Sequence, residues 1–213
     1  MVFYFLSKVV DPPMIIYMGI DKHENEELLK WGFPEDVWFH VEDMSSAHVY
    51  LRPPMGMSID DIPKEVIADC AQLVKANSIQ GSKTPSVRVI YTPFPNLMKT
   101  PDMDVGQVGF HDGKKSRIVV VEKKDHDILR RLNKTKEEKN PNLREEKEAR
   151  DRKERQEMRK KREEERRLEK EKIERAKKEE ELRSYQSIMT DENMKTNKLE
   201  EGFDYKAFED DFM

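Results

Sequence analysis

The stretch that decides the fold reads DVWFHV over residues 36–41 and, after a short polar connection, SSAHVYL over residues 45–51. Both runs are rich in β-branched and aromatic residues, which favour strands, and the polar residues between them suit a reversal of the chain. Side chains alternate between the two faces of a strand, so one face of this hairpin is apolar. The other face carries an indole, two imidazoles and a phenol, from Trp38, His40, His48 and Tyr50.

This polar aromatic face has two interpretations. In the first it is solvated, so that the indole stacks on bases or ribose and the imidazoles donate hydrogen bonds to phosphate. In the second, Trp38 completes a small second core and the histidines hydrogen-bond to the backbone, which an isolated hairpin of this kind favours. The segments on either side of the hairpin favour the first interpretation.

Several short motifs around the hairpin occur together and in a fixed order. They read GIDKHENEEL at residues 19–28, DVWFH at 36–40, SAHV at 46–49, ANS at 76–78, VRVIYT at 87–92, KTP at 99–101 and GQV at 106–108. Together they resemble the NFACT-R domain, the C-terminal RNA-binding module of the NFACT proteins of ribosome quality control. The resemblance covers about residues 1–124 and departs from the family at Ser46-Ala47, where Gly-Ser is usual.

The resemblance implies a non-enzymatic nucleic-acid-binding protein, most directly one that binds RNA and associates with ribosomes or tRNA. The larger NFACT proteins act with tRNA on stalled large ribosomal subunits, but this chain has no room for their N-terminal domain and helical arms. We therefore do not expect this chain to carry out the tail synthesis of the larger NFACT proteins. Two alternatives stay open: a protein-interaction adaptor, and a protein that binds DNA through the same phosphate contacts.

Nine residues are candidates for the nucleic-acid site. Lysine and arginine would neutralise phosphates while the rings stack or hydrogen-bond, which gives recognition led by shape rather than by sequence. Asn25 has an alternative structural role, because it could cap or bridge the start of a helix. The nine are Lys22, His23, Asn25, Trp38, His40, His48, Lys75, Arg88 and Lys99.

Charge is concentrated toward the C-terminal end of the 213 residues, whose formal net charge is −4. Residues 143–183 hold 18 basic and 15 acidic side chains, whereas residues 1–142 hold 19 basic and 21 acidic ones. The N-terminal part is thus nearly neutral and lacks the broad basic footprint of many nucleic-acid-binding proteins. Binding there would need a local patch.

The hydrophobic pattern predicts a single α+β domain with a mainly antiparallel sheet and two helices over residues 1–124. Besides the hairpin, strands are expected at residues 2–6, 15–20, 87–91, 105–110 and 117–121. The last two strands flank His111-Asp112-Gly113, which predicts a hairpin turn between them. One helix is expected after Asp21 and a second over about residues 62–77.

Behind this domain we expect a charged helical segment over residues 125–183 and a disordered, acidic-aromatic tail over residues 184–213. The few apolar residues of 143–183 do not keep a heptad, so a single helix laced by i,i+4 ion pairs is expected rather than a true coiled coil. Residues 143–183 and the tail segment 203–213 are the expected sites for protein partners. The alternative for the tail is an inert solubilising role.

Other classes of protein are not expected from this sequence. Cys70 is the single cysteine, which excludes an internal disulfide and fits a buried thiol in a reducing compartment. No apolar run approaches about 18 residues, so neither a membrane-spanning segment nor a signal peptide is expected. No phosphate-binding loop is present, and His40, His48 and Cys70 lack the close spacing of zinc ligands. We expect no cofactor, no metal and no catalysis, in a protein of the cytoplasm, with the nucleus open as a second location.

Overall fold

The computed structural model of the protein describes residues 1–184 and residue 189. Nearly all of the expected tail, including the segment 203–213, lies outside the described residues. The chain divides into one compact unit over Met1–Arg152 and a second over Lys153–Met213. The first unit contains the whole sheet and the first residues of the charged helix.

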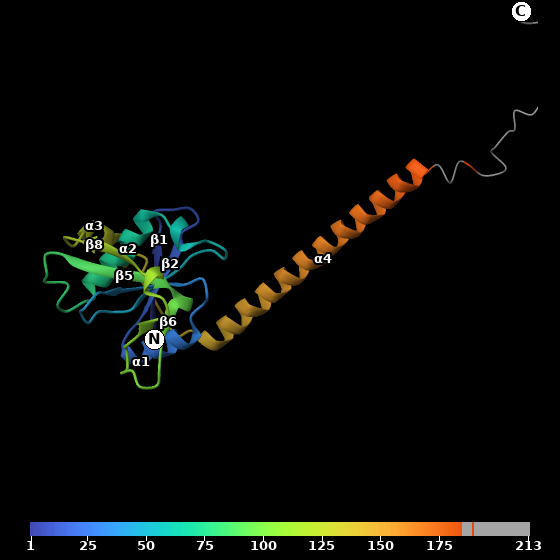
Figure 1. Cartoon of the computed structure of the whole chain (residues 1–213). Helices are drawn as coiled ribbons and strands as arrows, with labels where there is room; N and C mark the ends of the chain where they lie inside the picture. Colours follow the sequence, from blue (N-terminus) through green and yellow to red (C-terminus); the bar gives the residue numbers. More distant parts are fainter. Residues whose placement is uncertain (185–188, 190–213) are drawn as a thin grey trace, which may run out of the picture. The chain divides into compact units, whose positions relative to one another are not determined.

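Seven antiparallel strands form the main sheet, in the order β8-β5-β3-β4-β2-β1-β9. Figure 1 labels β1, β2, β5 and β8 of this sheet. They are β1 (Val2–Ser7), β2 (Met14–Gly19), β3 (Val37–Val41), β4 (Val49–Arg52), β5 (Val87–Pro93), β8 (Arg117–Val121) and β9 (Glu137–Lys139). A separate small sheet pairs β6 (Leu97–Met98) with β7 (Gly109–Phe110). The helices are α1 (Lys22–Trp31), α2 (Lys64–Ala76), α3 (His126–Asn133) and α4 (Leu143–Ser184). The α+β class with a mainly antiparallel sheet is confirmed.

Helix α2 builds the main core on one face of the sheet. Five of its apolar residues recur at helical spacing and are completely or almost completely buried, namely Val66, Cys70, Ala71, Leu73 and Val74. The helix contacts β3, β4 and β5. Val37, Phe39 and Val41 meet them from alternate positions of β3. Cys70 lies in this core with no exposed surface, and burial raises the pKa of its thiol. The expected buried cysteine is confirmed.

The opposite face of the sheet is a second core rather than a solvated surface. Trp38 is only 2% exposed, and it packs with Tyr17, Tyr50 and Leu28, the last of which comes from α1. The rings of Tyr17 and Tyr50 stack with their centroids 5.0 Å apart. The expectation of a solvated indole on this face is therefore wrong, because α1 and the chain after β5 cover it.

The expected hairpin between residues 105–110 and 117–121 does not form, because β7 pairs with β6 and β8 pairs with β5. Asn96 gives the physical reason. Its side chain accepts from the Asp112 amide and donates to the Asp112 carbonyl, each at 2.9 Å, and the Asp112 carboxylate accepts from the Lys114 amide. Residues 97–110 are thus closed into a loop of their own before β8 begins.

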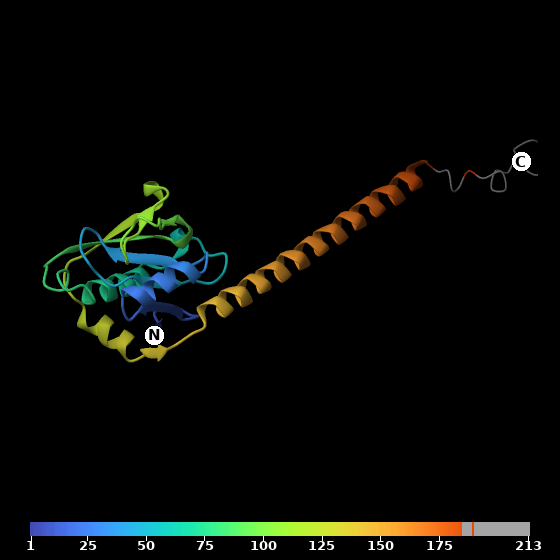
Figure 2. The same ribbon diagram turned by 90° about the horizontal axis from the view of Figure 1, so that it is seen from below.

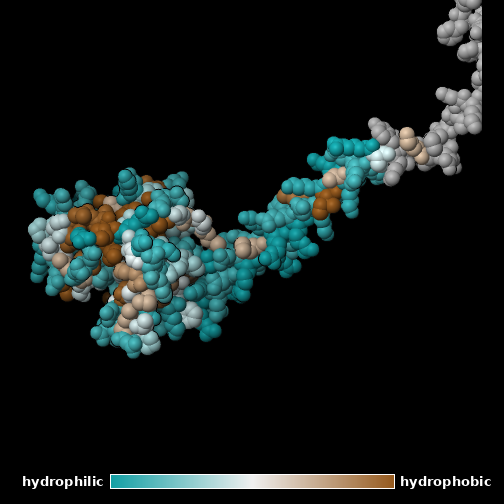
Figure 3. Space-filling view, in the orientation of Figure 1, coloured by the Kyte–Doolittle hydropathy of each residue, from teal (hydrophilic) through white to brown (hydrophobic). Residues whose placement is uncertain are grey.

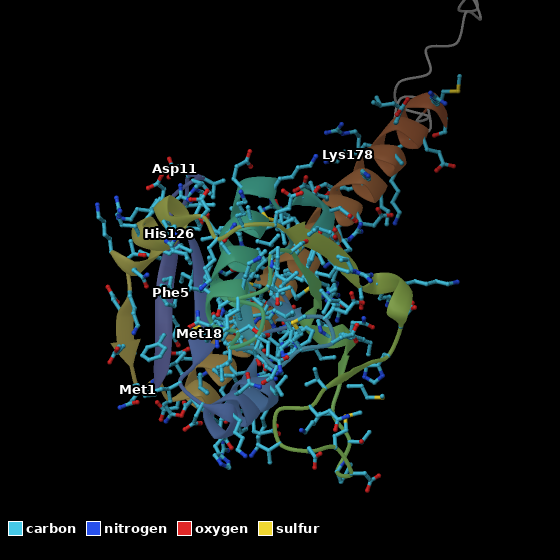
Figure 4. The ribbon with its side chains drawn as sticks, turned by 90° about the vertical axis from the view of Figure 1, so that its left-hand side faces the viewer. Met1, Phe5, Asp11, Met18, His126 and Lys178 are labelled. Carbon is cyan, nitrogen blue, oxygen red and sulfur yellow. The ribbon has the colours of Figure 1, made fainter. Side chains whose placement is uncertain are left out.

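Strand β9 was not expected from the sequence, because Glu137, Glu138 and Lys139 show no apolar alternation. It exists through its pairing with β1, on the side of β1 that β2 does not occupy. Figure 4 shows this edge, with Phe5 marking β1 and Met18 marking β2. The chain can be followed from α3 through β9 into α4 in Figure 2.

Helix α4 has no buried residue along its 42 positions. Ion pairs at i,i+4 run along it, including Arg144–Glu148, Arg159–Glu163 and Arg183–Glu179. Such exposed helix pairs contribute only about 0.3–0.5 kcal/mol each. The expected charged helix is confirmed within the described residues, whereas its expected lack of a coiled-coil partner stays a prediction. No helix in this part of the chain is both long and apolar enough to cross a membrane.

Lys75 ties α2 to the ends of two strands from inside the domain. It is 1% exposed, and its ammonium donates to the carbonyls of Thr84 (3.0 Å), Pro85 (3.1 Å) and Val121 (3.2 Å), and also to that of Glu122. Burial lowers the pKa of this ammonium. An ammonium has three N–H groups, and all of them are engaged by these carbonyls. The expectation that Lys75 contacts phosphate is therefore wrong.

Replacing Lys75 by methionine should lower the free energy of unfolding by about 2–4 kcal/mol, because the aliphatic stem is kept while four carbonyls lose a charged donor. Urea unfolding of the full chain measures this loss. The exposed Lys83, changed to methionine in the same way, should stay within about 0.5 kcal/mol of the natural protein. Natural stability in Lys75→Met would contradict the assignment.

Candidate nucleic-acid interface

A cleft of about 690 Å³ opens where the end of β2, the start of α1 and the connection between β3 and β4 meet. Asn77 and Ile79, just after α2, and residues 105–107 complete its walls. Four of the nine predicted site residues line it together, namely Lys22, Asn25, His40 and His48. Polar groups from elements far apart in the sequence thus converge on one hollow, which is the usual form of a binding site.

The first turn of α1 brings Lys22 to the mouth of the cleft. Asp21 caps the helix, and its carboxylate accepts from the amides of His23 (2.9 Å) and Glu24 (2.8 Å). These bonds lower the pKa of the Asp21 carboxyl, the bond from Glu24 having the largest effect. Lys22 and His23 are exposed, but only Lys22 lines the cleft.

Behind the cleft, the Trp38 indole supports two imidazoles. Its Nε1–H donates to His48 Nδ1 at 2.8 Å, and its ring stacks on that of His40 with centroids 5.4 Å apart. The two imidazoles meet edge to face at 4.8 Å. His40 and His48 reach the cleft while Trp38 does not line it. The indole therefore orients the imidazoles and offers no open face to a base.

Both imidazoles are neutral at pH 7. Burial lowers the pKa of His40, and burial together with the neighbouring His40 lowers the pKa of His48 to about 3. Since His48 Nδ1 accepts from the indole, the proton of the neutral ring is on Nε2. The imidazoles at the cleft are therefore neutral rather than cationic, and they already hydrogen-bond to backbone groups, His48 to Gly106 and His40 to Val41 and Ser46.

Asn25 lies on α1, lines the same cleft and is 4% exposed. Its Oδ1 accepts from the Tyr50 hydroxyl at 2.7 Å, while its Nδ2 has no hydrogen-bond partner among the described residues. A buried amide donor without a partner costs about 1–3 kcal/mol, so such groups in folded proteins call for an explanation. Asn25 lines the cleft, but its Nδ2 atom has less than 1 Å² of exposed surface, so an acceptor atom of a ligand would reach this donor only by displacing the atoms that cover it.

Lys99 shapes the cleft from behind one of its walls. Its ammonium donates to the Glu26 carboxylate (2.9 Å) and to the carbonyls of Asp104 (2.7 Å) and Gln107 (3.0 Å). The same carboxylate accepts from the Gly106 amide at 2.7 Å. Gly106 has a φ of +88°, a conformation that favours glycine, and it lies in the cleft wall. The structure gives Lys99 the role of holding the loop 99–107.

Arg88 lies elsewhere. It is on β5, where its side chain is 61% exposed and pairs with Glu42 at 2.9 Å. The nine predicted residues therefore fall into three groups. Four line the cleft, two (Trp38 and Lys99) support it from behind, and three (His23, Lys75 and Arg88) lie outside it.

Other cleft residues were not among the predicted nine, notably Asn77, Gly106 and Gln107. They belong to the ANS and GQV motifs, which the sequence offered as part of the family pattern without a role. These residues are far from the hairpin in sequence, so the sequence does not show that they lie beside it. In the fold, α2 and the loop 99–107 place them next to the hairpin. Across the described residues no group of three His, Cys, Asp or Glu side chains is placed to hold a metal ion.

Known proteins share the sequence motifs of this domain. The family model of the NFACT protein RNA binding domain matches residues 1–112. Coiled-coil domain-containing protein 25 of Danio rerio is 62% identical over 213 residues, covering 100% of both chains, and its Dictyostelium discoideum homolog is 54% identical over the same length. The protein from Mus musculus is 56% identical over 199 residues, 93% of this chain and 96% of that one.

The fold also occurs among solved structures. The C-terminal part of the fibronectin/fibrinogen-binding protein from Streptococcus suis superposes with a TM-score of 0.50 at 22% identity, over 61% of this chain and 48% of that one. The sequence matches show more than the fold. The chain belongs to the NFACT-R family of RNA-binding domains, and it is similar over its full length to the coiled-coil domain-containing protein 25 group.

Replacing His48 by glutamine should flatten the acid dependence of stability. Burial lowers the pKa of His48 from 6.5 to about 3. Between these two pH values the imidazole is protonated in the unfolded chain and neutral in the folded chain, so a fall in pH favours unfolding. The natural protein therefore loses up to about 1.4 kcal/mol per pH unit at this site below pH 6.5. Glutamine takes up no proton, and its carbonyl can still accept from Trp38.

Urea unfolding at pH 7, 6, 5 and 4 measures the slope. His111, which is exposed, provides the matched control, and His111→Gln should keep the natural slope. An unchanged slope in His48→Gln would show that His48 is not the buried neutral group described here.

Proposed function

We propose that this protein is a non-enzymatic RNA-binding factor of the translation machinery, which holds an unpaired nucleotide of ribosomal RNA or tRNA in the cleft. Membership of an RNA-binding domain family supports the class of ligand. The observation that carries the proposal is the partnerless Asn25 amide in the cleft, beside two neutral imidazoles. Such groups suit the donor and acceptor pattern of a base edge, which RNA exposes in loops, bulges and ends.

The charge of the site also favours a nucleotide held by its base. Two of the predicted cations are engaged within the protein, Lys75 by carbonyls and Lys99 by Glu26. Lys22 lies at the mouth, where it has no ion pair in the described part of the chain and can meet a phosphate. One or two phosphate contacts position a strand, while the base contacts supply discrimination.

Replacing Asn25 by aspartate should weaken the binding of single-stranded RNA at least tenfold. The variant keeps the oxygen that accepts from Tyr50 and removes the donor, leaving the base acceptor unpaired. Fluorescence anisotropy with a labelled RNA measures the affinity, and circular dichroism establishes that the variant is folded. Gln80→Glu introduces the same charge beside the lining residue Ile79 and should change the affinity less than threefold. Equal losses in both variants would show that charge, rather than the missing donor, is responsible.

The salt dependence of binding should be shallow. With Lys22 as the main phosphate contact, log affinity should fall with log salt at a slope of about −0.7 per contact, and Lys22→Ala should flatten the slope by about 0.7. The matched control is Lys30→Ala, an exposed lysine at the far end of α1, which should leave the slope unchanged. A steep slope that Lys22→Ala does not alter would move the binding surface away from the cleft.

The two alternatives from the sequence give different outcomes in the same assays. Equal affinity for single-stranded DNA and RNA of one sequence would show that the 2′-hydroxyl is not read. Association with ribosomal particles that survives nuclease treatment, and that is lost when residues 153–183 are deleted, would favour the adaptor. RNA binding that requires Asn25 favours the proposed function.

A further inference from the structure

The two edge strands of the main sheet, β9 and β8, differ in how many charged side chains they carry. At one edge, β9 carries Glu137, Glu138 and Lys139, and charged side chains at an edge strand discourage another strand from pairing with it. At the other edge, β8 reads RIVVV. This second edge has no such charges along its middle three residues, so it is open to strand pairing.

The direction of the backbone in β8 follows from its neighbours. The Glu42 amide donates to the Arg88 carbonyl at 2.8 Å, so the backbone groups of Arg88 face β3. In an antiparallel ladder successive residues face opposite sides, so Val87, Val89 and Tyr91 bond to β8. The register places them opposite Val121, Val119 and Arg117. The amides and carbonyls of the two residues between, Ile118 and Val120, therefore point to the open edge.

The side chains of the same two residues are exposed. Ile118 is 44% and Val120 59% exposed, and the register places them beside Ile90 and Arg88 on the sheet face that α2 does not cover. Figure 3 shows apolar surface gathered over the part of the domain where β5 and β8 lie. Unpaired backbone groups and apolar side chains thus coincide on one edge. This combination is what a peptide needs to add a strand to a sheet.

Four lysines bracket this edge, Lys114 and Lys115 before β8 and Lys123 and Lys124 after it. None of the four has an ion pair within the described residues, whereas Arg117 pairs with Asp60 and Arg88 with Glu42. A second copy pairing antiparallel about Val119 would bring Lys114 and Lys115, which lie in a 3-10 turn before β8, toward Lys123 and Lys124 of that copy. Like charges directly opposite are destabilising, so the edge is unsuited to itself.

We propose that β8 is a docking edge for an extended segment of a partner protein, apolar at alternate positions and acidic at both ends. The segment adds an antiparallel strand outside β8. Its backbone bonds to Ile118 and Val120, its apolar side chains lie beside theirs, and its acidic ends meet the lysine pairs. This surface is separate from the cleft, so peptide and RNA bind to different parts of the first unit.

A synthetic ten-residue peptide with alternating isoleucine and threonine at its centre and aspartates at both ends is the probe. Titrated into the isotope-labelled full chain, it should slow amide hydrogen exchange at Ile118 and Val120 at least tenfold. The amides of Val119 and Val121 should already be protected without it, because they bond to β5. A peptide that leaves the exchange of Ile118 and Val120 unchanged would overturn the proposal.

Two pairs of matched variants locate the contact. Methylating the isoleucine nitrogens of the peptide, which point to β8, should weaken binding at least tenfold, while methylating the threonine nitrogens, which point away, should have little effect. Val120→Pro should likewise abolish binding, since proline removes the outward N–H, and Val120→Thr should retain it. Equal binding by both members of either pair would refute the added strand.

Three further measurements test the charge of the peptide and the two other possible occupants of the edge. A peptide with lysines in place of the aspartates should bind at least tenfold more weakly, and equal binding would remove the charge argument. Sedimentation showing a dimer of the free protein that Val120→Pro dissociates would assign the edge to a second copy. Protection of Ile118 and Val120 by single-stranded RNA would assign it to RNA. Asn25→Asp should bind the peptide as the natural protein does, so the test stands apart from the proposed function.

Discussion

The first unit depends on one buried carboxylate. Asp36 has no exposed surface, and it accepts from the Tyr17 hydroxyl (2.6 Å), the Phe33 amide (2.8 Å) and the Arg52 guanidinium (2.9 and 3.1 Å). Removing a carboxylate from water costs several kcal/mol unless such bonds replace the lost hydration. The chain can therefore bury Asp36 only when β2, β4 and the start of β3 are in register around it.

That register builds the second core and, at its border, the cleft. Tyr17 lies opposite Tyr50, and Tyr50 opposite Trp38, so one row of aromatic rings crosses three strands. This row leaves no open face on the indole. At its border lie His40, His48 and Asn25, which are largely buried and also line the cleft. Their hydrogen-bonding state follows from this position, because burial keeps the imidazoles neutral and leaves one amide donor unpaired.

The same carboxylate also joins the sheet to the start of α4. Arg52, held by Asp36, lies 3.6 Å above the Phe33 ring and 4.0 Å from Glu146. Next to it in sequence, Glu35 pairs with Arg150 at 2.8 Å. This explains why the compact unit runs to Arg152, beyond the residues of the family match, which end at 112. Arg52, Lys75 and Lys99 complete the fold, so these three cations of the unit are not available to phosphate.

The sequence by itself determined the local elements and the family. Alternation in residues 37–41 and helical spacing in α2 depend on neighbours along the chain, so the α+β class and the charged helix followed from pattern alone. Four of the nine predicted site residues do line the cleft, because the family motifs were already informative about it. Only the tertiary structure decided what Lys75, Lys99 and Trp38 do. The sequence does not show whether the ammonium of a lysine contacts phosphate or four carbonyls. Nor does it show whether a helix covers an indole. Strand β9 and the open edge of β8 were hidden for the same reason: strand pairing is a contact between distant segments, and burial is decided by what packs on a residue rather than by the residue itself.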